Sequence, residues 1–413
     1  MEVRTDRGNQ GVLSLRPMNS PDSNTVIVVP DPVGDRYGTF GLISWWEQKL
    51  VRAATVMVVG AGALGNEVLK GLALMGVGRI FIVDFDTVEP GNLSRCVLFR
   101  KRDGGQRKAE IAAQAARELN PDVQTQWFHG DANHDLGLGV FRRMDVIVGC
   151  LDNREARLSV NRCCYQLKKP WVDGGIESLM GYARVFWPGR GACYECTLTD
   201  RDYQMINLRR SCGLLARQNL VLGKVPTTPT AAAIIGGVQT QETLKIINKL
   251  EVQPGSSFIF NGLTNDCYVT RLPEKQGCLS HGSLDEIIEF PSACAATTTV
   301  RQIVEETRKR LGPKAELSLG FDILQGWRCR HCGRHTAALQ PLHHVAETSA
   351  ICPDCKRERV PDVTDRLTGH ETFADQTLSA LGVPPLAVLY SMAGDRSIGL
   401  ELTGDAETLW TTV

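Results

Sequence analysis

The 413-residue sequence contains no apolar run that approaches the roughly 20 residues of a membrane-spanning helix. Its N-terminal segment also lacks the apolar core of a secretory signal peptide. Lys plus Arg and Asp plus Glu both total 46, so no excess charge favours bulk binding of nucleic acid or an anionic membrane. These absences predict a cytoplasmic protein for which nucleic acid is an unlikely partner.

What the sequence does contain is typical of a folded protein with a large core, since 43% of its residues are hydrophobic and 22% are charged. A chain of this length is expected to form two or three domains. Its fourteen cysteines are many for a reducing compartment, where stable disulfides are rare. Six of them form three Cys-x-x-Cys pairs, a spacing that indicates metal binding.

The most informative motif is the glycine-rich stretch Gly60-x-Gly62-x-x-Gly65. β-prone residues precede it, a helix-compatible segment follows, and a second short apolar run ends on Asp84. This order of strand, turn, helix, strand and acid is typical of a nucleotide-binding βαβ unit. The glycines permit a tight turn close to phosphate, and Asp84 is placed to accept hydrogen bonds from ribose hydroxyls. The motif predicts an adenosine nucleotide without specifying which one.

Polar residues follow at the positions where doubly wound sheets bind ligands. They are Asn92 and Arg95 in a polar loop, Lys108 at the start of an expected helix, and Asp152 after a short buried strand at 146–151. Cations suit phosphate oxygens, and a carboxylate beyond the end of a central strand suits Mg²⁺. Each residue alone fits a surface charge or a helix cap, but together they predict a triphosphate and Mg²⁺ site.

Taken in order, these motifs resemble the adenylation domain of E1-like enzymes. That family includes activating enzymes for ubiquitin-like proteins and the sulfur-carrier adenylyltransferases of molybdopterin and thiamine synthesis. The resemblance covers roughly residues 36 to 281 and implies a Rossmann-like, doubly wound α/β sheet. It is carried by Gly60-x-Gly62-x-x-Gly65-x-Glu67, Asp84-Phe85-Asp86-x-Val88, Asn92-Leu93-x-Arg95, Lys108-Ala109, Asp152-Asn153, Gly174-Gly175, Gly181, Cys193-x-x-Cys196 and residues 231–242.

The resemblance implies a role for each site residue. Asp84 would hold the ribose, and Asp152 would coordinate Mg²⁺. Arg95 and Lys108 would contact the phosphates, which Asn92 would position. The implied reaction is attack by a protein's C-terminal glycine carboxylate on the α-phosphate of ATP, with cations stabilising the developing charge. The residues assigned to the ATP site are Gly60, Gly62, Gly65, Asp84, Asp86, Asn92, Arg95, Lys108 and Asp152.

Two positions depart from the family pattern. Cys96 stands where the family often has Gln. Arg36-Tyr37 is followed by Gly38-Thr39, where many homodimeric members have a second arginine that reaches the partner's phosphates. The resemblance favours a homodimer, but it predicts no such arginine here.

Cys193 and Cys196 follow a loop and offer half of a tetrahedral zinc site. In the family the other half is a downstream Cys-x-x-Cys, and the corresponding residues of this chain are Cys278 and His281. The prediction is one Zn²⁺ bound by these four residues. In the alternative interpretation, Cys278 is a small buried residue and His281 a surface residue.

Cys329-x-x-Cys332 and Cys352-x-x-Cys355 form a zinc-ribbon pattern with nineteen residues between the pairs. Four local thiolates predict a structural Zn²⁺ site without an open position for catalysis. A swapped arrangement, in which the upstream pair joins one ribbon pair, would leave the other ribbon pair without partners.

Cys212 lies between the first cysteine pair and residues 226–229, in a polar segment that resembles the family's crossover loop. In the family, the cysteine of that loop accepts the activated carrier as a thioester. Flanking Arg209 and Arg210 would lower the pKa of this thiol. A buried loop cysteine is the alternative. Core positions are expected for Cys150, Cys163, Cys164 and Cys267.

The pattern changes near residue 284. A strand or two, a helix at 300–311 and further strands resemble a β-grasp module with a zinc ribbon inserted at about 327–358. Several ubiquitin-type activating enzymes use such a module to recruit an E2 conjugating enzyme, and a stabilising appendage is the alternative. The expected division is an extension at 1–35, an adenylation domain at 36–284 with its crossover loop at about 197–230, and an α+β domain at 285–413.

The sequence thus predicts an E1-like enzyme that uses Mg·ATP to adenylate the C-terminal glycine of a ubiquitin-like protein. The product would pass to Cys212 as a thioester for delivery to an E2. The nearest alternative is a sulfur-carrier adenylyltransferase that stops at the acyl-adenylate. A dehydrogenase would leave Arg95, Lys108 and Asp152 unexplained, and an inactive zinc-ribbon scaffold is the non-enzyme alternative.

Overall fold

A computed structural model describes residues 35–204, 226–393 and 396–410. The chain divides into two compact units, Met1–Ser44 and Trp45–Val413. In the first unit, a 3-10 helix spans Gly38–Leu42. The other helices and strands of the described residues belong to the second unit.

The larger sheet of the second unit has eight strands in the order β3-β2-β1-β4-β5-β6-β7-β8. Neighbours from β3 to β5 run parallel, and those from β5 to β8 run antiparallel. The strands are β1 (Thr55–Val59), β2 (Arg79–Val83), β3 (Gln124–Phe128), β4 (Val146–Gly149), β5 (Trp171–Glu177), β6 (Met180–Phe186), β7 (Ser256–Asn261) and β8 (Asp266–Arg271).

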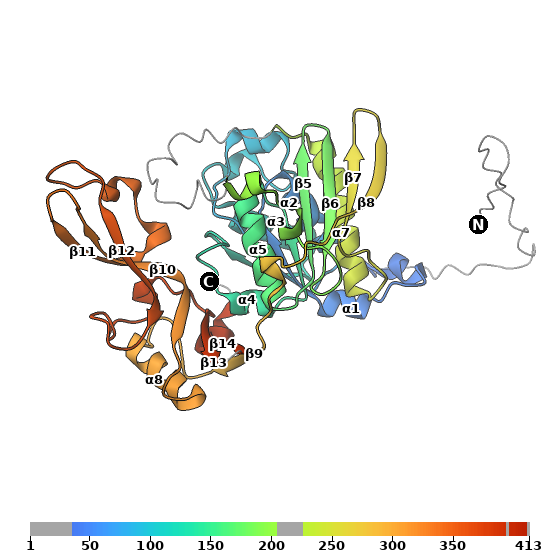
Figure 1. The fold of residues 1–413 in the computed structure, drawn as a ribbon. Coiled ribbons are helices and arrows are strands. Elements are labelled where there is room, and N and C mark those ends of the chain that lie inside the picture. Colours follow the sequence, from blue (N-terminus) through green and yellow to red (C-terminus); the bar gives the residue numbers. More distant parts are fainter. Residues whose placement is uncertain (1–34, 205–225, 394–395, 411–413) are drawn as a thin grey trace, which may run out of the picture. The chain divides into compact units, whose positions relative to one another are not determined.

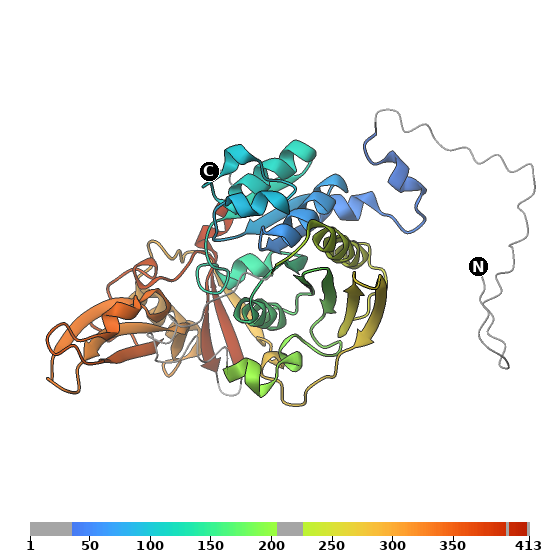
Figure 2. The same ribbon diagram turned by 90° about the horizontal axis from the view of Figure 1, so that it is seen from above.

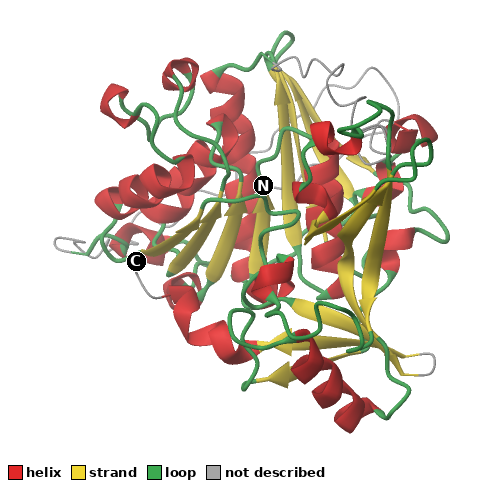
Figure 3. Ribbon diagram, turned by 90° about the vertical axis from the view of Figure 1, so that its left-hand side faces the viewer, coloured by secondary structure: helices red, strands yellow, loops and turns green. Residues whose placement is uncertain are grey.

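Helices cover both faces of this sheet (Figures 1 and 3). Residues of α1 (Gln48–Ala53), α2 (Ala63–Leu74), α3 (Lys108–Leu119) and α7 (Pro229–Ile247) contribute to one core. Residues of α4 (Leu138–Arg142) and α5 (Arg154–Gln166) contribute to the other.

The sequence of β1 is apolar because this strand is buried along its whole length. Val56 and Val58 enter the first core, whereas Met57 and Val59 enter the second, because successive side chains of a strand point to opposite faces. A strand that is buried on both faces is expected in a parallel sheet covered by helices. The predicted doubly wound α/β fold is confirmed. Its strand order reverses between β1 and β4, so a ligand crevice is expected at their carboxyl ends.

A second sheet has the order β11-β10-β13-β14-β9, with β12 paired to β10. Strands β9 and β14, the first and the last of this sheet along the chain, pair in parallel, and helix α8 packs against the sheet. In Figure 2 its elements, coloured orange to red, gather on one side of the first sheet. They are β9 (Glu286–Phe290), α8 (Val300–Leu311), β10 (Leu317–Arg328), β11 (His335–Pro341), β12 (Val360–Leu367), β13 (Val388–Ala393) and β14 (Arg396–Leu402). A strand, a helix and then strands is the predicted order, and the β-grasp assignment itself stays a prediction.

Residues of the second sheet also pack into the core that α4 and α5 form with the first sheet. Leu386 and Val388 pack in the same cluster as Phe141 of α4. Arg142 and Arg143 both pair with the fully buried carboxylate of Glu401 on β14. A buried carboxylate needs such partners, so these ion pairs hold β14 against α4. Among the helices that the structure describes, none combines the length and the apolar character that crossing a membrane requires.

Candidate nucleotide site and metal centres

The glycine-rich turn packs against the chain that leaves β4. Gly60 has a φ of 97°, and a Cβ at this position would lie 2.4 Å from the carbonyl oxygen of Cys150. A Cβ on Gly65 would lie 1.9 Å from the carbonyl oxygen of Gly60. Gly62 differs, because a Cβ there would meet no atom within 4 Å. The first and third glycines therefore shape the turn, and the second leaves its surface open to a ligand.

Helix α2 begins directly after this turn, and no side chain caps its first N–H groups. In contrast, Asn153 caps α5 through a 2.8 Å hydrogen bond to the N–H of Ala156, and Thr228 caps α7. Uncapped N–H groups at the positive end of a helix dipole favour an anion. The start of α2 therefore fits a phosphate group.

Asp84, immediately after β2, is oriented by the backbone around it. Its Oδ2 accepts a 2.7 Å hydrogen bond from the N–H of Ala61, and its Oδ1 accepts one of 2.8 Å from the N–H of Asp86. Burial raises the pKa of this carboxyl, while these hydrogen bonds and the charge of Lys108 oppose the shift. A carboxylate oxygen can accept more than one hydrogen bond, so Asp84 retains capacity for ribose hydroxyls.

Lys108 begins α3 and lies against Asp86. Its Nζ is 2.6 Å from Oδ2 of Asp86, and its backbone N–H donates to the carbonyl of Asp86 at 3.0 Å. The lysine side chain is only 9% exposed, whereas that of Asp86 is 52% exposed. A nearly buried ammonium group with a solvent-facing partner suits the binding of an anionic ligand at the same place.

The loop that carries Asn92 and Arg95 is held in shape by these two side chains. Asn92 is buried, and its Oδ1 accepts a 2.8 Å hydrogen bond from the N–H of Glu89. Arg95 donates to the carbonyl of Gly91 at 2.6 Å. Both hydrogen bonds lie within or beside the 3-10 helix Pro90–Ser94. Asn92 therefore stabilises this loop, in addition to its predicted role of positioning the phosphates.

Cys96, where the chain departs from the family pattern, is buried directly after Arg95. Burial raises the pKa of its thiol to about 11, so the thiol is neutral at pH 7. The charges of Arg95, Lys108 and Asp84 all act on it. These three predicted ATP ligands therefore lie close enough to Cys96 to influence its thiol.

Asp152 lies at the same edge of the sheet, two residues beyond Cys150. Its side chain is exposed, and its Oδ1 accepts a 3.2 Å hydrogen bond from the side-chain amide of Asn153. A solvent-facing carboxylate suits Mg²⁺, which retains several water ligands in most protein sites. The role of Asp152 as a ligand of Mg²⁺ stays a prediction.

Two buried residues that support the site were missed by the sequence analysis. Asn66 of α2 donates to the carbonyl of Ala61 and accepts from the N–H of Leu98, both at 2.8 Å. It thereby ties the loop of Arg95 to the glycine turn. Asn66 follows the last glycine of the motif, but a polar residue early in a helix gives no sign of a partner 32 residues away.

Arg157 of α5 is the second missed residue. Its Nε donates to Oδ1 of the fully buried Asp173 at 3.0 Å, and its Nη2 donates to the carbonyls of Leu151 at 2.6 Å and Gly174 at 3.0 Å. Burial raises the pKa of Asp173, and the charge of Arg157 opposes this shift. This clamp holds the ends of β4 and β5 beside Asp152. The available signal was an aspartate inside the apolar run of β5.

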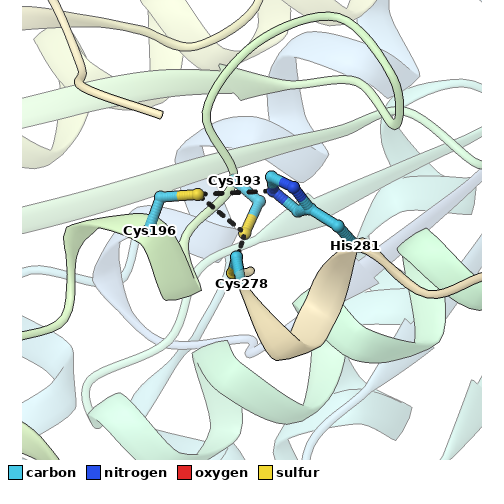
Figure 4. Close-up of side chains that lie close together, drawn as sticks. All are labelled: Cys193, Cys196, Cys278 and His281. Carbon is cyan, nitrogen blue, oxygen red and sulfur yellow. Dashed lines mark hydrogen bonds between the residues drawn. The ribbon is translucent and has the colours of Figure 1, made fainter. Parts of the chain in front are cut away.

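The four side chains of the first predicted zinc site converge from two segments of the chain (Figure 4). Sγ of Cys193 lies 3.6 Å from Sγ of both Cys196 and Cys278, and Sγ of Cys196 lies 3.3 Å from Nε2 of His281. All four ligand atoms lie within 4.8 Å of one another. The set suits tetrahedral Zn²⁺. The structure thus brings Cys278 and His281 to the upstream pair, and the binding of Zn²⁺ by these four residues stays a prediction.

The surroundings of this first cluster orient its histidine. The His281 ring stacks on Tyr165 with centroids 5.3 Å apart, and its Nδ1 lies 3.7 Å from a carboxylate oxygen of Glu274. A carboxylate behind a ligating imidazole is a common outer-shell arrangement in zinc sites. Burial raises the pKa of the Cys193 and Cys278 thiols, so the thiolate forms need a nearby cation.

The ribbon cysteines form a separate cluster. Sγ of Cys329 lies 3.4 Å from that of Cys355, and Sγ of Cys332 lies 3.6 Å from that of Cys352. All four sulfur atoms lie within 4.8 Å of one another. The swapped arrangement with the upstream pair is therefore wrong, because each cluster draws on its own pairs.

The other cysteines for which the sequence predicted a core position or a catalytic role divide into three groups. Cys150 and Cys164 are buried and Cys163 is half-buried, in line with their expected core positions. Cys267 is exposed, so its predicted core position is wrong. It lies on β8, an edge strand whose residues are all exposed. Cys212 lies outside the described residues.

Comparison with known proteins adds to this geometry. A model of the ThiF family matches residues 36–280. Ubiquitin-like modifier-activating enzyme 5 of Dictyostelium discoideum is 30% identical over 224 residues, which cover 51% of this chain and 56% of that protein. The adenylyltransferase and sulfurtransferase MOCS3-1 of Zea mays is 32% identical over 319 residues, 72% of this chain and 64% of that protein. The chain spans less than two thirds of the length of these relatives.

The fold is also found among solved structures. E. coli MccB, crystallised with ATP, aligns with a TM-score of 0.51 and 21% identity over 62% of this chain and 75% of that chain. The family match covers more than half of the sequence and extends from before the glycine turn to Cys278. The chain therefore belongs to the ThiF family, in agreement with the E1-like resemblance of its motifs.

Proposed function

We propose that this chain is an ATP-dependent, E1-like enzyme that activates a ubiquitin-like protein at its C-terminal glycine. The observation that carries the proposal is the geometry around the uncapped start of α2: Asp84 is bonded to the N–H of Ala61 in the glycine turn, and Lys108 lies against Asp86, two residues further on. An adenosine triphosphate needs a ribose acceptor, cations and free N–H groups at one place, and this edge of the sheet offers all three. Relatives named as modifier-activating enzymes support the choice of substrate.

In the first step, Asp84 would bind the ribose while Lys108, Arg95 and the N–H groups of α2 hold the phosphates. A carboxylate oxygen of the carrier's terminal glycine attacks the α-phosphorus, and the bond from that phosphorus to the bridging oxygen breaks. The products are acyl-adenylate and pyrophosphate. Mg²⁺ held by Asp152 would offset the charge on the phosphate oxygens. Because positioning and electrostatics supply most of the catalysis, a side chain need not act as a general base.

In the second step, the Cys212 thiolate would attack the acyl carbon, and AMP would leave as the thioester forms. This role comes from the sequence, since the segment lies outside the described residues. The arginines at 209 and 210 support it because they favour the thiolate form. Transfer from this thioester to an E2 completes the proposal.

We also infer that each cysteine cluster holds one structural Zn²⁺. Both clusters offer four protein ligands, which leaves no coordination position for a substrate. The first would join residues 193–196 to residues 278–281 and so hold the end of the α/β region together. The second would stabilise the knuckles of the ribbon.

A sulfur-carrier adenylyltransferase is the second candidate. The Zea mays relative, named as an adenylyltransferase and sulfurtransferase, is aligned over 72% of this chain. Both candidates share the adenylation step and differ at Cys212, because only the E1-like enzyme retains the carrier there as a thioester.

Carrier-dependent ATP–pyrophosphate exchange tests the proposal, with β-grasp proteins that end in glycine and are encoded beside this gene as substrates. We expect Lys108→Ala to reduce exchange by about 100- to 1,000-fold, because a preorganised charge at the phosphates is lost. Lys309→Ala, which removes an exposed lysine on α8, is the matched control. Absence of exchange together with absence of Mg·ATP binding would favour the scaffold, and NADH binding would favour a dehydrogenase.

A reducible carrier adduct on non-reducing gels then separates the two candidates. Cys212→Ala should abolish the adduct and leave exchange intact, whereas Cys267→Ser, at an exposed cysteine of β8, should retain both. Exchange without any adduct in the wild-type chain would point to the sulfur-carrier adenylyltransferase. Loss of both signals in Cys212→Ala would contradict the assigned role.

The region after residue 284 is proposed to recruit the E2, and the enzyme is proposed to act as a cytoplasmic homodimer. The core shared by Leu386, Val388 and Phe141 supports a stabilising role for the same region. Deletion of 286–413 would expose that core. Cross-linking of the intact chain to the E2 is therefore a better test of recruitment than truncation.

A further inference from the structure

A third group of potential metal ligands lies apart from both cysteine clusters. It contains Asp135, in the segment between β3 and α4, together with His343 and His344 of the 3-10 helix Leu342–His344. Their ligand atoms all lie within 4.8 Å of one another. Nε2 of His344 is 3.1 Å from Oδ1 of Asp135. The group is formed by two segments that are more than 200 residues apart in the sequence.

The carboxylate of Asp135 is oriented from behind. Its Oδ2 accepts a 2.8 Å hydrogen bond from the N–H of Asp131, and its own N–H donates to the carbonyl of Asp131 at 2.8 Å. These bonds direct Oδ1 toward His344. Outer-shell hydrogen bonds of this kind hold ligating carboxylates in place in known metal sites.

His343 is also held in position, by rings on two sides. It stacks on His134 with centroids 4.1 Å apart and meets Phe321 in a T-shaped contact at 5.4 Å. Its Nε2 is buried and has no hydrogen-bond partner among the described residues. A buried polar atom without a partner is energetically unfavourable, so a ligand at this nitrogen would remove a penalty.

We propose that Asp135, His343 and His344 form a third metal site that binds a divalent cation of the zinc type. Two imidazoles and one carboxylate match the ligand preferences of Zn²⁺ and Co²⁺, whereas Mg²⁺ and Ca²⁺ prefer sites made of oxygen atoms. In a tetrahedral zinc site with bonds of about 2.0–2.1 Å, neighbouring ligand atoms lie about 3.3 Å apart. The distance of 3.1 Å between His344 and Asp135 is close to this value.

The remaining coordination would come from water. The side chain of His344 is 50% exposed and that of Asp135 is 33% exposed, so solvent reaches the site. With three protein ligands and open access, the site should exchange its metal more readily than the two cysteine clusters do. The cation would tie the hairpin of β10 and β11, which carries the ribbon, to the segment that precedes α4. Occupancy of this link then depends on the free metal concentration.

Calorimetric titration of the full-length chain with Zn²⁺ tests this site. The protein is purified with its cysteine clusters loaded and is then treated briefly with EDTA and desalted. We expect one additional Zn²⁺ to bind per chain. Asp135→Asn and His344→Gln should each weaken that binding by about 10- to 100-fold, since both preserve side-chain size while removing a ligand. His370→Ala, at an exposed histidine outside the cluster, is the matched control.

The proposal is overturned if no additional Zn²⁺ binds, or if both variants bind it as tightly as the wild type. Co²⁺ absorption gives an independent readout that does not depend on the stability of the variants. Ligands of nitrogen and oxygen give weak visible bands, and their appearance with the additional equivalent supports the site. A strong thiolate-to-cobalt charge-transfer band for that equivalent would instead place the metal at a cysteine cluster and overturn the assignment.

Discussion

The two cysteine clusters offer similar ligands but are assembled over different distances along the chain. In the ribbon, all four cysteines lie between residues 329 and 355. In the other cluster, 85 positions separate Cys193 from Cys278, and α7, β7 and β8 lie between them. A link that closes a long segment restricts the unfolded chain more than a local link does. The long-range cluster is therefore expected to stabilise the α/β region, and the ribbon mainly itself.

The cysteines of the long-range cluster are also more deeply buried than those of the ribbon. Cys193, Cys196 and Cys278 are all buried and pack with Tyr165 of α5. In the ribbon, Cys332 is exposed, and a small cluster of its own contains Trp327 and Val345. The ribbon thus resembles an independent knuckle structure, whereas the other cluster is part of a larger core.

The largest expected effect comes from removing one ligand of each cluster. Cys278→Ser should lower the free energy of unfolding by about 4 kcal/mol, because a buried metal site within the α/β core is lost. Cys352→Ser should also lose one Zn²⁺ but leave Mg·ATP binding unchanged. Elemental analysis, urea unfolding and nucleotide titration measure the three quantities. Equal losses of ATP affinity in the two variants would remove the distinction between the clusters.

A smaller effect is expected from the carboxylate behind His281. Glu274→Gln should weaken zinc binding at the first cluster by about tenfold, because the orientation and basicity of the imidazole depend on its outer-shell partner. Asp354→Asn, which breaks the exposed ion pair with Arg334 beside the ribbon, should leave both zinc affinities unchanged. Competition with a chromogenic chelator measures both variants. An unchanged affinity in Glu274→Gln would show that the stacking on Tyr165 alone orients His281.

The smallest effects concern the two knuckles of the ribbon. Gly333 and Lys356 follow the second cysteine of each pair, with φ values of 73° and 59°. The left-handed conformation costs a residue other than glycine about 1 kcal/mol, so Lys356→Gly should stabilise the ribbon by up to this amount. Gly333→Ala should destabilise it by about 1 kcal/mol, since a Cβ there meets no atom within 4 Å and only the backbone conformation matters. The zinc affinity of the ribbon in each variant measures both effects. If Lys356→Gly and Gly333→Ala changed this affinity in the same direction, the left-handed conformation would not explain the effects.

Much of the fold could be predicted from local sequence. The helix at 300–311 and the start of a helix at Lys108 were predicted as the structure shows them, because apolar spacing and flanking residues act within a few turns. The glycine turn and the cysteine pairs of the ribbon could be predicted for the same reason, because their residues are close together in the sequence. Membership of the first cluster came from the family resemblance, since spacing alone does not connect Cys193 with Cys278.

The tertiary structure decided the features that depend on distant partners. Nothing near Arg157 shows that Asp173 will be buried beside it, and Cys267 is exposed only because β8 is the last strand of its sheet. Asp135 and His344 meet across 209 positions of sequence. Local patterns determine helices, turns and short-range ligand pairs because their energies act between near neighbours. Burial, long-range ion pairs and sites shared by two segments are decided by packing, which brings together residues whose proximity no spacing in the sequence records.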